Sequence, residues 1–141
     1  MTNELRIPRT LADQMVAHLR AERPNEGCGL LAGDLPAVTK VIRMTNAAFS
    51  PVRYSLDPDE QFAAYRTIDE AGLSLAGVFH SHTHTEAYPS PTDVRLASED
   101  VPYVIVSLAQ DPAVIRAFRI SKENWTDTDG AIVEVPVQID G

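Results

Sequence analysis

The segment "LSLAGVFHSH", from Leu73 to His82, is apolar at nearly every position until it ends in two histidines. A strand with one face in water alternates apolar and polar residues, whereas a strand covered on both faces is apolar throughout. The segment therefore predicts a central strand with other structure packed on each side of it. A mixed sheet flanked by helices supplies such cover, so we expect a fold of the α/β class, more specifically an α+β mixed sheet.

Three segments predict helices that could cover this sheet. The first begins at Thr10, which together with Asp13 has the spacing of a capping box, and its apolar residues share one helical face. The second begins at Asp57, with Glu60 in the position that completes a capping box. A third, short helix is expected in "PTDVRLAS". Each of these helices would pack its apolar face against the sheet.

The remaining strands follow from short apolar runs separated by turn residues. "CGLLAGD" and "AVTKVIRMTN" predict a hairpin, and three further strands are expected in "PYVIVSL", "AVIRAFRI" and "AIVEVPV". The chain has 141 residues and no long linker or repeat. We therefore expect one domain spanning residues 1–141.

Charge and cysteine content narrow the classes of function. Twelve basic against twenty acidic residues give a formal net charge of −8, and no basic run is interleaved with aromatic residues, which argues against nucleic-acid binding. No signal-peptide layout or apolar run of about 20 residues is present, so we expect a soluble, cytoplasmic protein without a membrane partner. A single cysteine, Cys28, excludes an internal disulfide and a zinc site built from several cysteines, including that of the zinc deaminases.

The two histidines at the end of the central strand point to a metal site. Because side chains two residues apart in a strand share a face, His80 and His82 project together while Ser81 points away. Catalytic zinc usually takes three protein ligands and leaves its fourth position to water. Asp93 can be the third ligand, because the loop of residues 83–89 is long enough to return it to the end of the strand. "SPTD" is also a capping box, so Asp93 has an alternative role as a helix cap.

A zinc ion held by two histidines and one carboxylate lowers the pKa of its bound water to about 7, but the reaction still needs a base. Glu26, in "RPNEGCGLL", is placed just before the first strand of the hairpin. On the residues alone it is either a solvated loop residue or an acid placed for chemistry.

Three residues near these motifs have competing interpretations. His84 shares the parity of the histidine pair, but the strand has to turn before reaching it, so we expect it to be no ligand. Cys28 could approach the metal pocket, although a small buried apolar residue is the favoured interpretation. His18, on the first predicted helix, is expected at the surface.

The motif as a whole resembles that of a known family. Glu26, "HSH" at residues 80–82, Ser90 and Asp93, with the pattern HSH-x7-S-x2-D, are similar to the signature of the JAMM, or MPN+, metalloproteases. The resemblance implies a cytidine-deaminase-like fold. It also implies that His80, His82 and Asp93 bind Zn²⁺, that Glu26 is the general base, and that Ser90 helps to stabilise the oxyanion.

Within that family the wider text, including "NEGCGLLAG" and "MTNAAFSPVRYSLDPDEQ", is similar to a small actinobacterial peptidase. That likeness implies hydrolysis after the C-terminal glycine of a ubiquitin-like sulfur-carrier protein with a Gly-Gly tail, with release of an amino acid such as cysteine. Arg53 and Tyr54 lie in the shared text and are candidate substrate contacts. The insertion with which eukaryotic relatives grip ubiquitin has no room before Ser90.

Two other functions remain possible from the sequence. "HSHTHTE" also fits a fragment of a cupin, but no histidine lies beyond His84 to supply the second half of that site. A non-catalytic scaffold or binding module of the MPN type is the more serious alternative. The intact set of Glu26, His80, His82, Ser90 and Asp93 favours an enzyme.

Overall fold

The computed structural model describes residues 4–141, so the first three residues of the predicted domain lie outside the described part. Among the helices of this part, none combines the length and apolar character needed to cross a bilayer. The elements follow in the order β1 (Leu5–Pro8), α1 (Arg9–Ala21), β2 (Cys28–Asp34), β3 (Ala37–Met44), α2 (Pro58–Glu70), β4 (Ser74–His82), α3 (Pro91–Leu96), β5 (Tyr103–Ser107), β6 (Val114–Ser121), β7 (Ala131–Val135) and β8 (Val137–Asp140).

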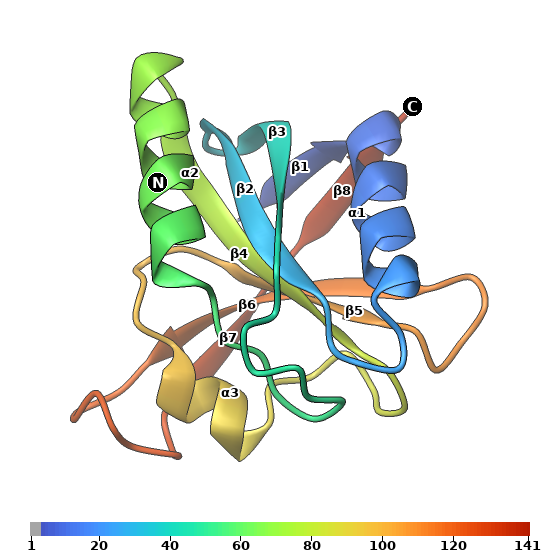
Figure 1. Ribbon diagram of the computed structural model, residues 1–141, viewed down its shortest axis with the longest axis vertical. Helices are drawn as coiled ribbons and strands as arrows, with labels where there is room; N and C mark the ends of the chain where they lie inside the picture. The colour runs from blue at the N-terminus through green and yellow to red at the C-terminus, as the bar shows by residue number, and fades with distance from the viewer. Residues whose placement is uncertain (1–3) are drawn as a thin grey trace.

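The strands form one mixed sheet in the order β7-β6-β5-β4-β2-β3-β1-β8, which confirms the predicted α/β class. β4 lies in the interior of the sheet, antiparallel to β2 and parallel to β5. β2 and β3 pair antiparallel as the predicted hairpin. In Figure 1 the sheet runs between α1 on one side and α2 on the other, with α3 near the end of β4.

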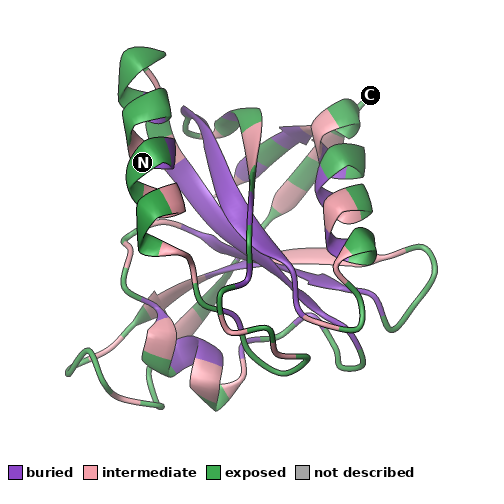
Figure 2. Cartoon of the chain, viewed as in Figure 1, coloured by how far each residue is buried: buried purple, intermediate pink, exposed green. Residues whose placement is uncertain are grey.

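The prediction that β4 is covered on both faces is confirmed, since its last seven residues are all buried. Alternate residues serve two cores. Phe79 packs in the cluster that includes Met15 and Leu19 of α1, whereas Val78 packs with Ala64 of α2. Figure 2 shows the result, with β2 and β4 buried and the outer faces of α1 and α2 exposed. The side chains at the end of β4 therefore lie in surroundings with little water.

The capping box predicted at Thr10 is wrong. α1 begins at Arg9, directly after β1, and its N-cap is Pro8, which makes no side-chain cap hydrogen bond. The incoming strand fixes where the helix begins, so Thr10 lies inside the first turn. At α2, Asp57 caps the helix as predicted, but Glu60 does not complete the box because its carboxylate accepts hydrogen bonds from Thr45 instead.

β8, at one edge of the sheet, and its neighbour β1 were not predicted, and "AIVEVPV" is not one strand. It divides at Pro136: β7 pairs with β6, and β8 pairs with β1 at the other end of the sheet. The Leu5 N–H donates to the Pro136 carbonyl oxygen at 2.8 Å. The segment that contains β7 and β8 therefore supplies both outermost strands of the sheet.

The pairing of Gly29 with Phe79 supplies a test of this packing. A methyl group on Gly29 would overlap the Phe79 ring and the Ile42 carbonyl oxygen. We expect Gly29→Ala to lower the free energy of unfolding by about 2–3 kcal/mol through overpacking, measured by urea denaturation. Gly72→Ala is the control, because the space around Gly72 is open and only its positive φ opposes a side chain, at about 1 kcal/mol. Equal losses in both variants would contradict the proposed close packing.

Candidate functional site

The end of β4 brings the two histidines of the motif together, as their spacing predicts. His80 and His82 are 1% and 5% exposed, and their Nε2 atoms lie 3.3 Å apart. Two imidazole nitrogens therefore face one point at the C-terminal end of β4. Neither ring is free to turn into bulk water.

Asp93 completes the cluster from the first turn of α3. One carboxylate oxygen lies 3.2 Å from His80 Nε2 and the other lies 2.9 Å from His82 Nε2. One potential ligand atom from each of the three residues lies within 4.8 Å of the others. Two nitrogens and one carboxylate oxygen at this spacing suit a metal ion.

The capping role of Asp93 coexists with its place in the cluster. The Asp93 N–H donates to Ser90 Oγ at 3.1 Å, and the Ser90 N–H donates to Asp93 Oδ2 at 3.0 Å, which completes the capping box. The two interpretations of Asp93 are thus compatible. The cap fixes the carboxylate at the position where it meets the histidines.

Contacts on the far sides of the imidazoles orient them. His82 Nδ1 lies 2.8 Å from the Glu86 carbonyl oxygen. Because a carbonyl only accepts, Nδ1 carries a proton, and Nε2 is the nitrogen that faces the cluster. The His80 ring stacks on Tyr54, with centroids 4.4 Å apart and planes 25° from parallel. Tyr54 is buried and sets the plane of one candidate ligand.

The charges of the cluster are coupled. Burial by itself would raise the pKa of Asp93, but hydrogen bonds from His80 and His82 hold that pKa well below its ordinary value. Burial would lower the pKa of His82, yet its hydrogen bonds to Asp93 and to the Glu86 carbonyl raise it. A buried anion therefore sits between two bases, which is a favourable place for a cation.

Glu26 is buried, at 3% exposure, so the interpretation as a solvated loop residue is wrong. Burial and the nearby charge of Asp93 raise its pKa to about 8, although the charge of His82 opposes this. Among the described residues its Oε1 atom has no hydrogen-bond partner. The structure thus places a carboxyl group with a raised pKa close enough to the cluster for the charges of Asp93 and His82 to affect that pKa.

Ser81, the middle residue of "HSH", ties Glu26 to β4. The Ser81 N–H donates to the Gly27 carbonyl oxygen at 3.1 Å, and the Gly27 N–H donates to Ser81 Oγ at 2.9 Å. Sequence reasoning assigned Ser81 no role beyond pointing away from the histidines. The sequence signal for it was a hydroxyl between the two histidines of a strand expected to be buried on both faces.

The other candidates are placed as follows. Ser90 is half-buried at the N-cap of α3, and Arg53 is exposed. Tyr54 lines, with Val78 and Tyr103, a hollow of about 210 Å³ beside the cluster. Contact of Arg53 or Tyr54 with a substrate stays a prediction.

His84 is exposed and outside the cluster, as expected. Cys28 is fully buried in an apolar cluster, and burial raises the pKa of its thiol to about 12, which supports its interpretation as a small core residue. The expectation that His18 lies at the surface is wrong. It is half-buried because its Nε2 lies 2.9 Å from the Cys28 carbonyl oxygen.

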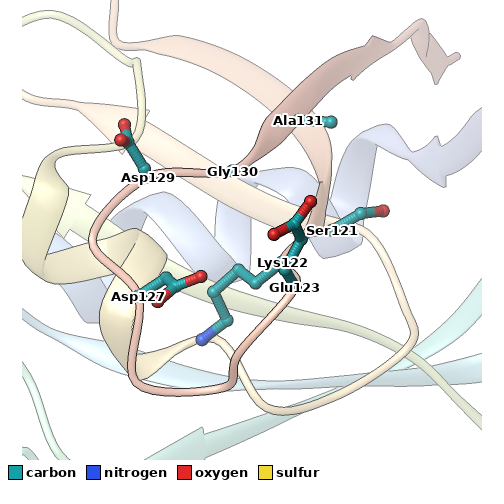
Figure 3. Close-up of a pocket in the computed structure, with 7 residues that line it drawn as sticks. All are labelled: Ser121, Lys122, Glu123, Asp127, Asp129, Gly130 and Ala131. Carbon is teal, nitrogen blue, oxygen red and sulfur yellow. The ribbon is translucent and has the colours of Figure 1, made fainter.

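A larger hollow lies elsewhere, in the loop between β6 and β7. It encloses about 560 Å³, and Lys122 extends into it (Figure 3). The Lys122 ammonium already donates to the carbonyl oxygens of Arg95 and Trp125. None of the cluster residues lines it, so chemistry and not size identifies the candidate site.

Comparison with known proteins gives one family and several relatives. Residues 8–121 match the family described as prokaryotic homologs of the JAB domain. The chain is 45% identical to a CysO-cysteine peptidase of Mycobacterium tuberculosis, over 92% of this chain and 86% of the relative. It is 42% identical to a probable TtuB-protein conjugate cleaving protease of Thermus thermophilus, over 72% of this chain and 68% of the relative. The solution structure of protein DSY2949 from Desulfitobacterium hafniense superposes with a TM-score of 0.84 at 34% identity, covering 96% and 92% of the two chains.

The raised pKa of Glu26 predicts that this carboxyl group destabilises the metal-free protein. Below its ordinary pKa of 4.5 the group is protonated in both states. Between pH 4.5 and about 8 only the unfolded state ionises, so stability is lost as pH rises and then levels off. At pH 7 this cost is on the order of 3 kcal/mol.

We therefore expect Glu26→Gln to gain stability relative to the wild type between pH 4.5 and pH 7, measured by denaturant unfolding of chelator-treated protein. Comparing the two pH values removes any constant effect of the amide. Glu70→Gln, on an exposed part of α2, is the control for replacing a carboxylate by an amide. A Glu26→Gln difference that does not change with pH would show that Glu26 ionises normally.

Proposed function

The chain belongs to the family of prokaryotic homologs of the JAB domain, and from this membership we propose that it is a zinc-dependent metallopeptidase. Its proposed substrate is a ubiquitin-like sulfur-carrier protein, and the bond broken follows the carrier's C-terminal glycine. The names of the mycobacterial and Thermus relatives support a carrier of this class and cysteine as the amino acid released. We also propose that residues 1–141 form one domain.

The observation that carries the proposal is the convergence of His80, His82 and Asp93. Two buried imidazole nitrogens and a carboxylate that stays ionised form a donor set that zinc prefers. When bound there, zinc polarises the scissile carbonyl and lowers the pKa of a bound water. The Tyr54 ring and the Glu86 carbonyl would hold the two imidazoles ready for it.

Glu26 would move the proton. A carboxyl group with a pKa near 8 can both accept and donate a proton around neutral pH, which is the range in which general acid–base catalysis is efficient. In this proposal Glu26 takes the proton from the attacking water and passes it to the amine that leaves. The water oxygen is retained in the new carboxyl group of the carrier, and the amino acid departs with a free amino group.

Ser90 would act through its hydroxyl hydrogen. Its Oγ atom accepts the hydrogen bond of the helix cap from the Asp93 N–H. A serine hydroxyl can accept and donate at the same time, so its hydrogen remains available for the oxyanion that forms at the scissile carbonyl. One position of the side chain thereby serves both the cap and the chemistry.

The Gly-Gly tail of the substrate would have to lie close to the candidate site. A Gly-Gly tail has no side chains, so it can pass close to backbone and aromatic rings. The hollow beside Tyr54 is a candidate binding site for the tail or for the leaving amino acid. Arg53, which precedes Tyr54 and is exposed, is a candidate contact for a carboxylate.

The alternative of a non-catalytic scaffold fits the site less well. A scaffold has no use for a buried carboxyl group whose Oε1 atom has no hydrogen-bond partner in the described part of the chain, since such a group costs stability. The retention of Glu26 beside three potential ligands favours an enzyme.

Zinc content tests the metal centre. We expect about one zinc per chain in the wild type, and well below that in His82→Ala and Asp93→Asn, measured by mass spectrometry of the metal in gel-filtered protein. His84→Ala is the matched control, since His84 is two residues from His82 but exposed. Equal zinc loss in His84→Ala, or full zinc content in Asp93→Asn, would contradict the proposed ligand set.

Mass spectrometry of a carrier protein bearing a C-terminal cysteine tests the reaction. Zinc-loaded enzyme should remove the mass of one cysteine residue, and a chelated sample should not. Glu26→Gln should keep its zinc and lose at least about 100-fold in rate. A Gln variant with a near-normal rate would remove Glu26 from the mechanism, and no cleavage by the zinc-loaded wild type would overturn the proposed substrate.

A further inference from the structure

Asn46 is a buried polar residue at the start of the loop that leads from β3 to α2. It is 5% exposed and follows Thr45 at the end of the strand. The sequence gives it no place in the JAMM motif. Its side-chain amide is nevertheless bonded at both ends.

The donor end of the amide faces backbone carbonyls. Nδ2 donates to the Glu26 carbonyl oxygen at 2.9 Å and to the Arg53 carbonyl oxygen at 3.0 Å, with a longer contact of 3.4 Å to the Ser50 carbonyl oxygen. The acceptor end, Oδ1, receives the N–H groups of Ala48 and Ser55, both at 3.0 Å. Only an amide supplies donors and an acceptor in this arrangement.

These bonds fix the backbone of the general base. The Glu26 N–H donates to the Ser50 carbonyl oxygen at 2.9 Å, and its carbonyl accepts from Asn46. The carboxyl Oε1 atom has no partner among the described residues. The direction of the side chain therefore depends on where its backbone is held.

The same amide holds Tyr54. The residues on either side of Tyr54 are both bonded to Asn46, Arg53 through its carbonyl and Ser55 through its N–H. Tyr54 in turn stacks on the His80 ring. Asn46 thus connects the backbone of the base to the ring that supports one candidate ligand.

The loop that Asn46 closes is strained. Phe49 has a φ of 47°, in the left-handed region that a bulky side chain disfavours. Its N–H donates to the Asn46 carbonyl oxygen at 3.2 Å. Such a conformation persists only where surrounding bonds determine it, and residues held in this way occur often at functional sites.

We propose that Asn46 is a positioning residue that sets the Glu26 carboxyl group and the Tyr54–His80 stack relative to each other. The proposal rests on the proposed peptidase function for its kinetic consequence. A displacement of about 1 Å at a catalytic group can lower the rate about 100-fold. The hydrogen bonds of Asn46 would therefore affect turnover although Asn46 does not touch the substrate.

Asn46→Asp is the variant that tests it. Asp has the same shape and keeps the acceptor end, but it places an oxygen against the carbonyls of Glu26 and Arg53. We expect kcat/KM for release of cysteine from the carrier to fall about 10- to 100-fold, with most of the loss in kcat and zinc still bound.

Glu60→Ala is the matched control. The Glu60 carboxylate accepts from the N–H and the hydroxyl of Thr45, both at 2.7 Å, and so anchors the neighbouring residue of the same loop without touching Glu26. We expect its rate, corrected for the folded fraction, to stay within about threefold of wild type, a change below 1 kcal/mol. An equal loss in both variants, or a rate within threefold for Asn46→Asp, would overturn the positioning role.

Amide hydrogen exchange, followed by NMR on the metal-free chain, gives a readout independent of activity. The Glu26 amide should exchange faster in Asn46→Asp, because the Glu26 carbonyl loses its Asn46 donor, whereas the Ala48 and Ser55 amides, whose acceptor is kept, should change less. All three should remain near wild type in Glu60→Ala. Unchanged exchange of the Glu26 amide in Asn46→Asp would overturn the positioning role itself. If the wild type cleaves no carrier, the proposed substrate fails, and the exchange result still decides whether Asn46 holds Glu26.

Discussion

The buried carboxylate of Asp93 is the charge around which the site is organised. It stays ionised because two imidazoles and a helix cap bond to it, and its charge adds to the effect of burial in raising the pKa of Glu26. Such an arrangement is stable only if the surrounding structure holds each partner in place, since an unpaired buried charge is costly. The sheet, the cap and the loop around Asn46 each fix one member of the set.

The central strand supplies both the geometry and the low dielectric. Because β4 is covered by α1 on one face and by α2 on the other, it is buried up to its C-terminal end. The alternation of side chains then divides the motif by function. His80 and His82 face the cluster, whereas Ser81, on the opposite face, ties β4 to Gly27 and so to Glu26.

Local sequence predicts those parts of the molecule that local geometry determines. The convergence of His80 and His82 follows from the period of a strand, and the box at Ser90 and Asp93 follows from the period of a helix. The start of α1, by contrast, depends on its junction with β1, and β1 pairs with a strand about 130 residues later in the chain. The burial of Glu26 and its hydrogen bond from Asn46 likewise depend on contacts between separate segments of the chain, which no spacing rule reveals.

The Glu26 carboxyl group links stability to function. A residue chosen for packing alone would carry no ionisable group at this position, whereas Glu26 has a carboxyl group whose raised pKa keeps it largely protonated at neutral pH and whose Oε1 atom has no hydrogen-bond partner among the described residues. A cation at the neighbouring cluster would lower the cost, because its positive charge stabilises the ionised form. The metal-free chain is therefore the least favourable state of the site, and ligand binding and folding reinforce each other. Such coupling suits an enzyme, in which cofactor binding offsets the free-energy cost of a buried carboxyl group, better than it suits a scaffold.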